Sequence, residues 1–236
     1  MACRSPRWAF VGLAALATSG CHSGGTDALA VVSHASETTA GQHTAHVTVK
    51  GTGAFLGVPI TGVGSIDFDK HALHLDFEGS TTQITIIGED AYASIPMSTK
   101  WTHTRHQSDE FDALRSPSDP TTLINVLREV SSSVREVGHE PIRGVQTIHF
   151  HAEVNRPREE ATDGAPGTSS STPRSRTFPV DVWIGASKIL RIAWTVPPSA
   201  GDDAGAASVI SFAEDFSDFG VAVSISAPPA PEVVEQ

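Results

Sequence analysis

The sequence predicts one α+β domain built mainly on antiparallel β-strands. Three observations support this fold class. Many segments alternate apolar and polar residues, turn residues such as glycine, proline and aspartate separate those segments, and two other segments repeat apolar residues every three or four positions. A period of two is typical of strands with one buried face, whereas the longer period is typical of helices. Of the 236 residues, all but the first 20 are available to this domain.

The first 20 residues have the composition of an export signal. Arg4 and Arg7 precede an apolar run over residues 8–18, and small residues then lead directly to Cys21. The run is too short to span a bilayer, and small residues before a cysteine are typical of signals after which lipid is attached to the thiol. We expect residues 1–20 to be removed and Cys21 to be lipidated. The alternative is an ordinary secretory signal followed by an incidental cysteine.

Charge and cysteine content exclude several classes of protein. The net charge is −11, and loss of the two signal arginines would change it to −13, which is unsuited to binding nucleic acid. Because Cys3 leaves with the signal, Cys21 would be the last cysteine, so neither an intrachain disulfide nor a thiolate metal site is expected. No second apolar run approaches the roughly 18 residues of a membrane-spanning helix. We therefore expect an extracytoplasmic protein held at the outer leaflet of the cytoplasmic membrane by lipidated Cys21.

A short tether over residues 21–27 precedes the domain, which we place at residues 28–227. At about 3.4 Å per residue the six residues after Cys21 reach roughly 20 Å, so the domain would stay close to the membrane. A helix is expected at its start, with Thr26 or Asp27 as the N-cap and Gly41 after its end. Its apolar side would contain Ala28, Leu29, Val31, Val32 and Ala35.

Strands follow this helix. A turn over residues 68–72 joins two of them, and His74 and Asp76 are expected on the opposite face from the apolar residues of the second strand. The apolar positions of these first strands are Val47, Val49, Ile60, Val63, Ile66, Phe68, Leu73, Leu75 and Phe77. Further strands are predicted at residues 83–87, 91–95, 101–104 (a short edge strand), 148–154, 180–184, 190–196, 209–212 and 221–225.

A second helix is predicted in the middle of the chain. Asp119 is a good N-cap, Pro120 is favoured at the first helical position, and Gly138 is a natural end. The apolar stripe could belong to a solid core or cover the concave side of a sheet, and periodicity does not separate the two. The stripe contains Leu123, Ile124, Leu127, Val130 and Val134.

Three segments are expected to lie outside regular structure. Residues 156–177 are rich in proline, glycine, serine, threonine and charge, so we expect a disordered hairpin loop. Residues 215–220 would connect the last two strands. Residues 228–236 form a proline-rich C-terminal tail.

Motifs of common enzymes are absent. The sequence contains no Gly-x-Ser-x-Gly, no His-Glu-x-x-His and no Gly-x-x-x-x-Gly-Lys. Glu159 and Glu160 lie in the loop predicted to be disordered, where no fixed geometry for acid–base catalysis is expected. We therefore expect neither an enzyme nor a cofactor.

The chain has eleven histidines, which raises the question of a metal site. Two histidines on one strand face are not a complete zinc or copper site, and no third ligand is identifiable, so no metal is expected. Trp183 and Trp194 could contact the headgroup of a ligand, but tryptophans in strands more often serve packing. The histidine pairs considered are His149 with His151, His71 with His74, and His43 with His46.

In the order of its motifs, the chain resembles the LolA-like lipoproteins of actinobacteria, the group typified by LppX and LprG. The resemblance covers nearly all of the chain after the signal, and each motif alone is weakly specific. The motifs are the cysteine signal at Cys21 with the helix after it, Gly64-Ser65-Ile66-Asp67-Phe68, Asp119-Pro120, Val180-Asp181-Val182-Trp183-Ile184 with Leu190-Arg191, Phe216-Ser217-Asp218-Phe219-Gly220 and Ile225-Ser226-Ala227-Pro228-Pro229.

The resemblance implies a strongly curved antiparallel sheet, a half-barrel, with helices packed on its concave face and an apolar cavity between them. Characterised relatives bind the acyl chains of lipids or glycolipids and help to carry them across the cell envelope, some beside a membrane transporter. The alternative is a structural or partner-binding envelope lipoprotein in which the same residues fill a solid core. The candidate ligand-binding residues are Phe68, Leu75, Phe77, Leu123, Leu127, Ile148, Phe150, Val182 and Ile192.

Overall fold

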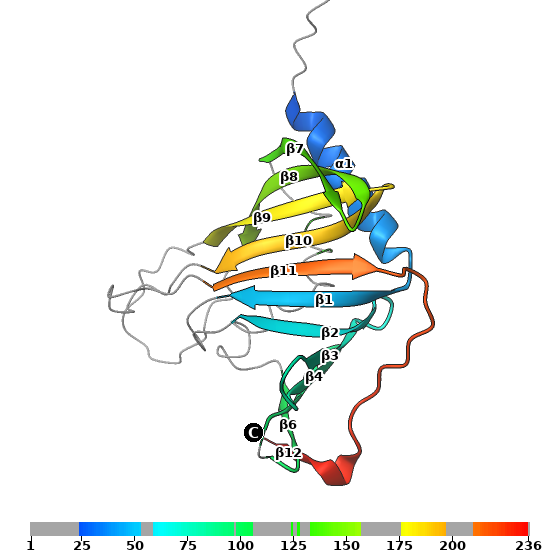
Figure 1. Ribbon diagram of the computed structural model, residues 1–236, viewed down its shortest axis with the longest axis vertical. Coiled ribbons are helices and arrows are strands. Elements are labelled where there is room, and N and C mark those ends of the chain that lie inside the picture. Colours follow the sequence, from blue (N-terminus) through cyan, green and yellow to red (C-terminus); the bar gives the residue numbers. More distant parts are fainter. Residues whose placement is uncertain are drawn as a thin grey trace, which may run out of the picture.

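The computed structural model describes residues 24–52, 59–96, 98–105, 124, 127, 133–156, 176–196 and 210–235. Within these ranges the chain forms one long helix, α1 (Gly24–Ala40), a short 3-10 helix, η1 (Ala230–Glu232), and a single sheet of 12 strands (Figure 1). No helix in these ranges has the length and hydrophobicity needed to cross a membrane. The strands are β1 (Thr44–Thr52), β2 (Ile60–Asp67), β3 (Ala72–Phe77), β4 (Gln83–Ile87), β5 (Asp90–Ser94), β6 (Trp101–Arg105), β7 (Val134–Ile142), β8 (Val145–Arg156), β9 (Arg176–Gly185), β10 (Lys188–Val196), β11 (Ile210–Ser217) and β12 (Val233–Glu235).

The sheet consists of two meanders joined in its middle. Strands β1 to β6 pair in sequence order, as do β7 to β11, and the pairing of β1 with β11 joins the two series. Every pair is antiparallel except β12 with β6, which is parallel. The predicted α+β fold with a large antiparallel sheet is therefore confirmed. The strands change direction steadily from β11 and β1 toward β6 (Figure 1), whereas the half-barrel curvature stays a prediction.

The period-two alternation of the first strands is confirmed, with one exception. Leu73 and Leu75 are buried, and Asp76 on the opposite face is exposed. Val63, predicted on the apolar face, is instead 40% exposed. The reason is that Gly62 and Gly64 occupy the inward positions of β2, where the Phe77 ring approaches Gly62 and the backbone of β3 approaches Gly64.

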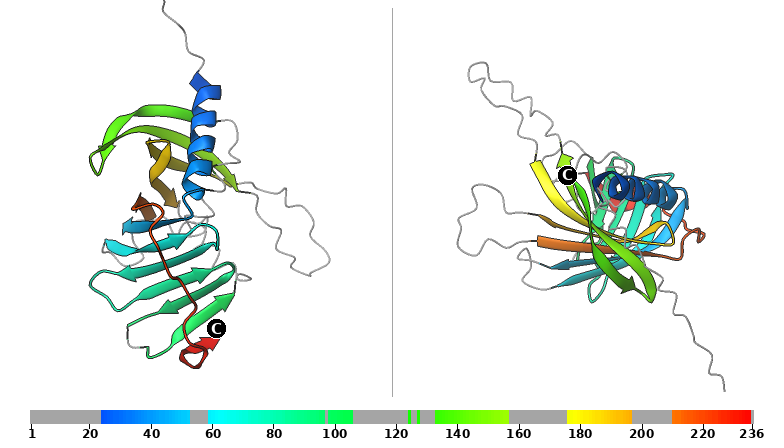
Figure 2. Two further views of the ribbon diagram at one scale, coloured as in Figure 1. Left: turned by 90° about the vertical axis from the view of Figure 1, so that its right-hand side faces the viewer. Right: turned by 90° about the horizontal axis from the view of Figure 1, so that it is seen from above.

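Helix α1 covers only one half of the sheet. It packs against β7, β9 and β10, and Figure 2 shows it running beside this half while β2 to β6 extend away from it. Ala28, Val32 and Ala35 are buried in the contact as predicted, but Val31 faces outward and is 39% exposed. The helix also begins before the predicted start and ends at Ala40, directly before Gly41.

A buried threonine ties α1 to the sheet. The Thr39 hydroxyl donates to the Ala35 carbonyl at 2.7 Å and accepts the backbone N–H of Ile189 at 2.8 Å. Thr39 is fully buried, so this hydroxyl satisfies a backbone donor of β10 that would otherwise be buried without a partner.

The prediction of a second helix is only partly confirmed. Ile124 and Leu127 are helical and fully buried, as the stripe predicts. Val134 is not its continuation, because β7 begins there and pairs with β8 from Val134 to Ile142. Gly138 ends no helix and lies instead at an irregularity of the β7–β8 register. The other stripe residues Leu123 and Val130, together with Asp119-Pro120, lie outside the described residues.

The C-terminal region contains two further differences. Strand β11 continues to Ser217, so the first three residues of the predicted connection at 215–220 belong to a strand. Residues 221–225 were predicted as a strand and form none, whereas the proline-rich tail contains η1 and β12. The loop at 156–177, with Glu159 and Glu160, lies outside the described residues except at its two strand ends.

Candidate functional site

The predicted ligand-binding residues lie on one side of the sheet, in a single hydrophobic core cluster. Leu123 lies outside the described residues, and Phe77 and Ile148 pack at the margin of the cluster. The cluster also includes residues of α1 and the helical Ile124. Its members among the candidates are Phe68, Leu75, Leu127, Phe150, Val182 and Ile192.

Strand register arranges several of these residues in one row across the sheet. Phe150 on β8 is opposite Val182 on β9, which is opposite Ile192 on β10. The row continues through Glu214 on β11, Val49 on β1 and Gly62 on β2 to Phe77 on β3. Directly opposed residues project from the same face of a sheet. We name these seven residues the apolar row, although its central member carries a carboxyl group.

Glu214 is the functional candidate that the sequence reasoning missed. Its side chain has 0% exposure and lies between Val49 and Ile192 in the apolar row. The sequence does contain a pattern that indicates this burial. Phe212, Glu214 and Phe216 alternate along the strand and therefore share a face. A fully buried carboxyl group in the middle of an apolar surface is rare.

A second, neighbouring row places a tryptophan on the same side. Trp194 on β10 is opposite Phe212 on β11, with ring centroids 5.5 Å apart. Phe212 is in turn opposite Gly51, where a Cβ atom would lie 3.2 Å from the Phe212 ring. Trp194 is 3% exposed, and its indole N–H has no hydrogen-bond acceptor within the described parts of the chain. Such a buried donor calls for a specific explanation.

The opposite, outer face of the sheet is polar. His149 and His151 project from the same face of β8, as predicted, and each has a ring nitrogen about 3 Å from the same Asp181 carboxylate oxygen. Trp183 stacks on His149 at 4.2 Å between ring centroids and donates its indole N–H to Glu140. Its role is therefore packing on the outer face.

The other histidine pairs do not converge. His43 bonds to Asp69 and His46 to Asp218, while His74 bonds to Thr85 on the neighbouring strand. Over the ranges that the structure covers, no three histidine, cysteine or acidic side chains are grouped as a metal site would require. The outer face instead contains carboxylate hydrogen bonds and an ion pair between Arg191 and Asp215 with two N–H···O contacts, which raises the pKa of Arg191.

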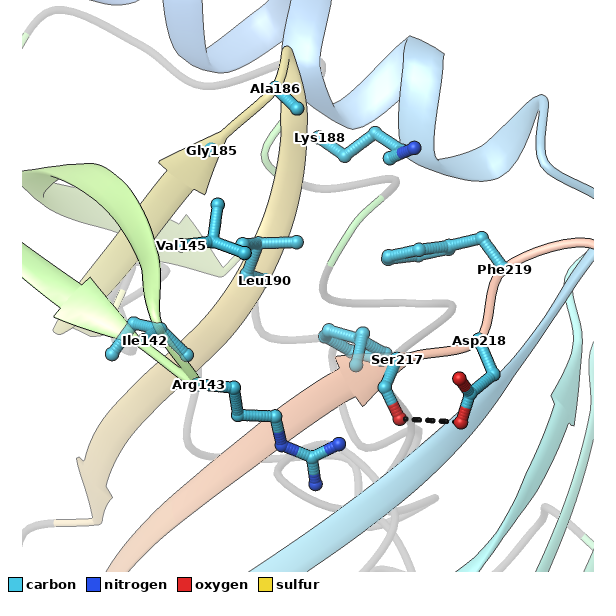
Figure 3. Close-up of a pocket in the computed structure, with 11 residues that line it drawn as sticks. Ile142, Arg143, Val145, Gly185, Ala186, Lys188, Leu190, Ser217, Asp218 and Phe219 are labelled. Carbon is cyan, nitrogen blue, oxygen red and sulfur yellow. Dashed lines mark hydrogen bonds between the residues drawn. The ribbon is translucent and has the colours of Figure 1, made fainter.

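A pocket of about 280 Å³ opens where three turns meet at one end of the sheet (Figure 3). It is lined from the β7–β8 turn, the β9–β10 turn and the segment that follows β11. None of the nine candidate residues lines it. Among the described residues, two distinct places are therefore considered: the apolar row, which the sequence predicted in part, and this pocket, which it did not.

Comparison with solved structures identifies the architecture. The crystal structure of lipoprotein LppX from Mycobacterium tuberculosis matches with a TM-score of 0.52 and 18% identity, over 85% of this chain and 98% of LppX. The chain has the fold of LppX. The resemblance stated from the sequence is thereby confirmed for the fold. LprF from Mycobacterium bovis matches with a TM-score of 0.48 and 13% identity, over 87% of this chain and 99% of LprF. No protein-family model matches the chain, and no curated protein does.

Proposed function

We propose that this protein is a membrane-anchored envelope lipoprotein that binds the acyl chains of a lipid or glycolipid and carries it across the cell envelope. The observation that supports this function best is the apolar row, which crosses seven strands of a sheet with the LppX fold. Six spacings of about 4.8 Å make the row about 29 Å long. A surface of this length suits an extended alkyl chain better than a small polar ligand.

Binding of an alkyl chain along the row would be driven by burial of its methylene groups. Each methylene contributes about 0.8 kcal/mol when it leaves water for an apolar surface. Phe150, Val182 and Ile192 offer only carbon atoms to such a chain. The strongest binding is therefore expected on the β8 to β10 part of the row, which α1 borders.

Trp194 suggests where the polar end of the ligand lies. Its indole N–H is buried without an acceptor in the described ranges, and Trp194 lies two residues along β10 from Ile192 of the apolar row. We propose that it donates to a carbonyl or hydroxyl oxygen at the head of the acyl chain. A hydrogen bond there would satisfy a donor whose burial otherwise costs about 1–3 kcal/mol.

The competing function is that of a structural or partner-binding lipoprotein whose row is filled by its own side chains. Burial of the row supports both functions, because a solid core and a closed, lipid-lined cavity each exclude water. Uptake of lipid distinguishes them, since a solid core has no space for an alkyl chain.

The deciding experiment uses protein exported with Cys21→Ser from a lipid-producing host. We expect mass spectrometry to detect co-purified acyl lipid, and a fluorescent fatty acid to bind the delipidated protein. Val182→Phe, which adds volume in the row, should lower uptake at least fivefold. Val63→Phe, the same substitution at an exposed position of the other face, should leave uptake unchanged. Folded protein that repeatedly contains no lipid and takes up no probe would show that the row is a solid core.

A further inference from the structure

The pocket at the end of the sheet has an apolar interior. Its walls include Ile142 and Val145 from the β7–β8 hairpin, Leu190 from β10, and Phe219 after β11 (Figure 3). Gly185 allows these walls to meet, because a Cβ atom there would lie 2.9 Å from Leu190 Cδ1 and 3.1 Å from Val145 Cγ1. A larger residue at this glycine would push the two side chains apart.

The pocket belongs to the outer face and not to the apolar row. Val145 is 42% exposed and differs by an odd number of positions from Ile148 and Phe150, which face the core. Ser217 likewise follows the core residue Phe216 on β11 and faces the other way. Phe216 lines the pocket from the core, but no candidate of the apolar row does.

Two cations stand on either side of this apolar interior. Arg143 extends from the β7–β8 turn and Lys188 from the start of β10 (Figure 3). Within the described ranges neither forms an ion pair: Arg143 donates to the Thr48 hydroxyl at 3.3 Å, and the Lys188 ammonium lies 5.1 Å from the Phe219 ring centre. The pocket is thus lined by two cations and one carboxylate, that of Asp218, in a chain of net charge −11.

The carboxylate at the pocket is already engaged. Asp218 Oδ2 accepts a hydrogen bond from the Ser217 hydroxyl at 3.3 Å and lies 3.1 Å from His46 Nδ1. Both contacts of this carboxylate are therefore with groups other than Arg143 and Lys188. An anionic group at the rim would form a charge-assisted hydrogen bond with Arg143 or Lys188, which is stronger than a neutral one.

We propose that this pocket binds a single-chain anionic amphiphile, with its alkyl chain against Leu190 and Val145 and its carboxylate at the rim, where Arg143 and Lys188 lie on opposite sides. The volume of about 280 Å³ equals that of about nine water molecules at about 30 Å³ each. This space accommodates one medium-length alkyl chain. The site is independent of the function proposed for the apolar row.

The test is titration of the Cys21→Ser protein with decanoate and, separately, with decanol. Calorimetry should detect decanoate binding, and NMR should show shifts of the Val145 and Leu190 methyl groups. The double variant Arg143→Gln, Lys188→Gln should weaken decanoate binding at least tenfold and leave decanol binding within twofold. Lys50→Gln removes an exposed cation from β1 and should change neither.

Two results would overturn this proposal. One is decanoate binding that shifts only the methyl groups of Val182 and Ile192, which would assign the ligand to the apolar row alone. The other is a folded double variant that binds decanoate as tightly as the parent. Leu190→Trp, which fills the pocket without altering charge, should abolish binding of both ligands at this site and supports the proposal independently of the cations.

Discussion

At the scale of single residues, Gly64 shows how closely two backbones approach within the sheet. It lies on β2 opposite Leu75 on β3, and a Cβ atom at this position would lie 1.8 Å from the His74 carbonyl oxygen. Real Cβ atoms never come so close to a backbone atom, so any side chain here requires the strands to separate. The glycine of the Gly64-Ser65-Ile66 motif is therefore required by strand packing and not by ligand chemistry.

We predict that Gly64→Ala lowers the free energy of unfolding by about 3 kcal/mol, because neither strand can move without breaking its ladder. Gly138→Ala is the matched control, since no atom lies within 4 Å of a Cβ there, and it should change stability by less than about 1 kcal/mol. Chemical denaturation of both variants measures the difference. Equal stability of the two variants would contradict this account of Gly64.

The candidate site was predictable residue by residue only where alternation was regular. Val182 and Ile192 were assigned to the buried face because strands of uniform period leave no other choice. Val63 was misassigned because the small Gly62 and Gly64 carry no apolar signal, although they hold the inward positions. The burial of Glu214 is not predictable in this way, because a carboxyl group in a strand normally faces solvent.

At the scale of elements, the wrong predictions of secondary structure arise where strands pair with partners distant in the sequence. The helical stripe predicted from Leu123 onward includes Val134, but the pairing of β7 with β8 from Val134 to Ile142 outweighs that local pattern. Strand β12 was unpredictable for the same reason: three residues of a proline-rich tail become a strand only because β6 offers a free edge. The pocket depends on three turns from distant parts of the chain, so no local pattern indicates it.

Strand β12 is held at the edge by a histidine between two carboxylates. His103 Nδ1 lies 2.7 Å from Glu235 on β12, and Nε2 lies 2.9 Å from Asp90 on β5. The ring also stacks on Tyr92, and Arg105 pairs with Asp90. Hydrogen bonds to Asp90 and to Glu235 raise the pKa of His103 above its ordinary value of 6.5.

A pH dependence follows from this raised pKa. The protonated histidine stabilises the folded state, so its full contribution is present below pH 6.5 and is lost as the pH rises through the folded-state value. We expect Glu235→Gln to reduce stability by about 0.5 kcal/mol near pH 6 and to have no effect near pH 9, because the contact is partly exposed.

Glu232 is an exposed carboxyl group on η1. Glu232→Gln is therefore the matched control and should show no such pH dependence. Thermal unfolding at both pH values, together with hydrogen exchange of the β6 amides, provides the measurement. A Glu235→Gln effect that grows toward alkaline pH would contradict the assignment of the charge to His103.

At the scale of the whole molecule, attachment to the membrane is expected to depend on the lipid carried by the sulfur of Cys21. Cys21 lies outside the described residues, and within the described ranges no helix is able to cross a membrane. The net charge of −11 does not favour adsorption to anionic lipids. Because lipid on Cys21 is the proposed anchor, we predict that Cys21→Ser moves the protein from the membrane fraction to the secreted fraction, measured by fractionation and immunoblotting.

Cys3→Ser provides the control for this prediction, because Cys3 lies in the segment that we expect to be removed on export. It should leave the protein in the membrane fraction. Retention of the Cys21→Ser protein in that fraction after a high-salt wash would show that the cysteine is incidental and that another contact holds the protein.

The sheet has two edges, one at β7 and one at β6 with β12, and different features limit pairing at each. At the β7 end, Pro141 has no N–H to offer and the irregularity at Gly138 interrupts the strand, both of which discourage pairing with another sheet. At the opposite edge of the sheet, β6 contains no proline and no irregularity. The three residues of β12 pair with this strand in parallel and cover part of its edge. A chain that loses residues 233–235 would therefore present an uncovered strand edge to other copies, so the last strand protects the protein against self-association and aggregation.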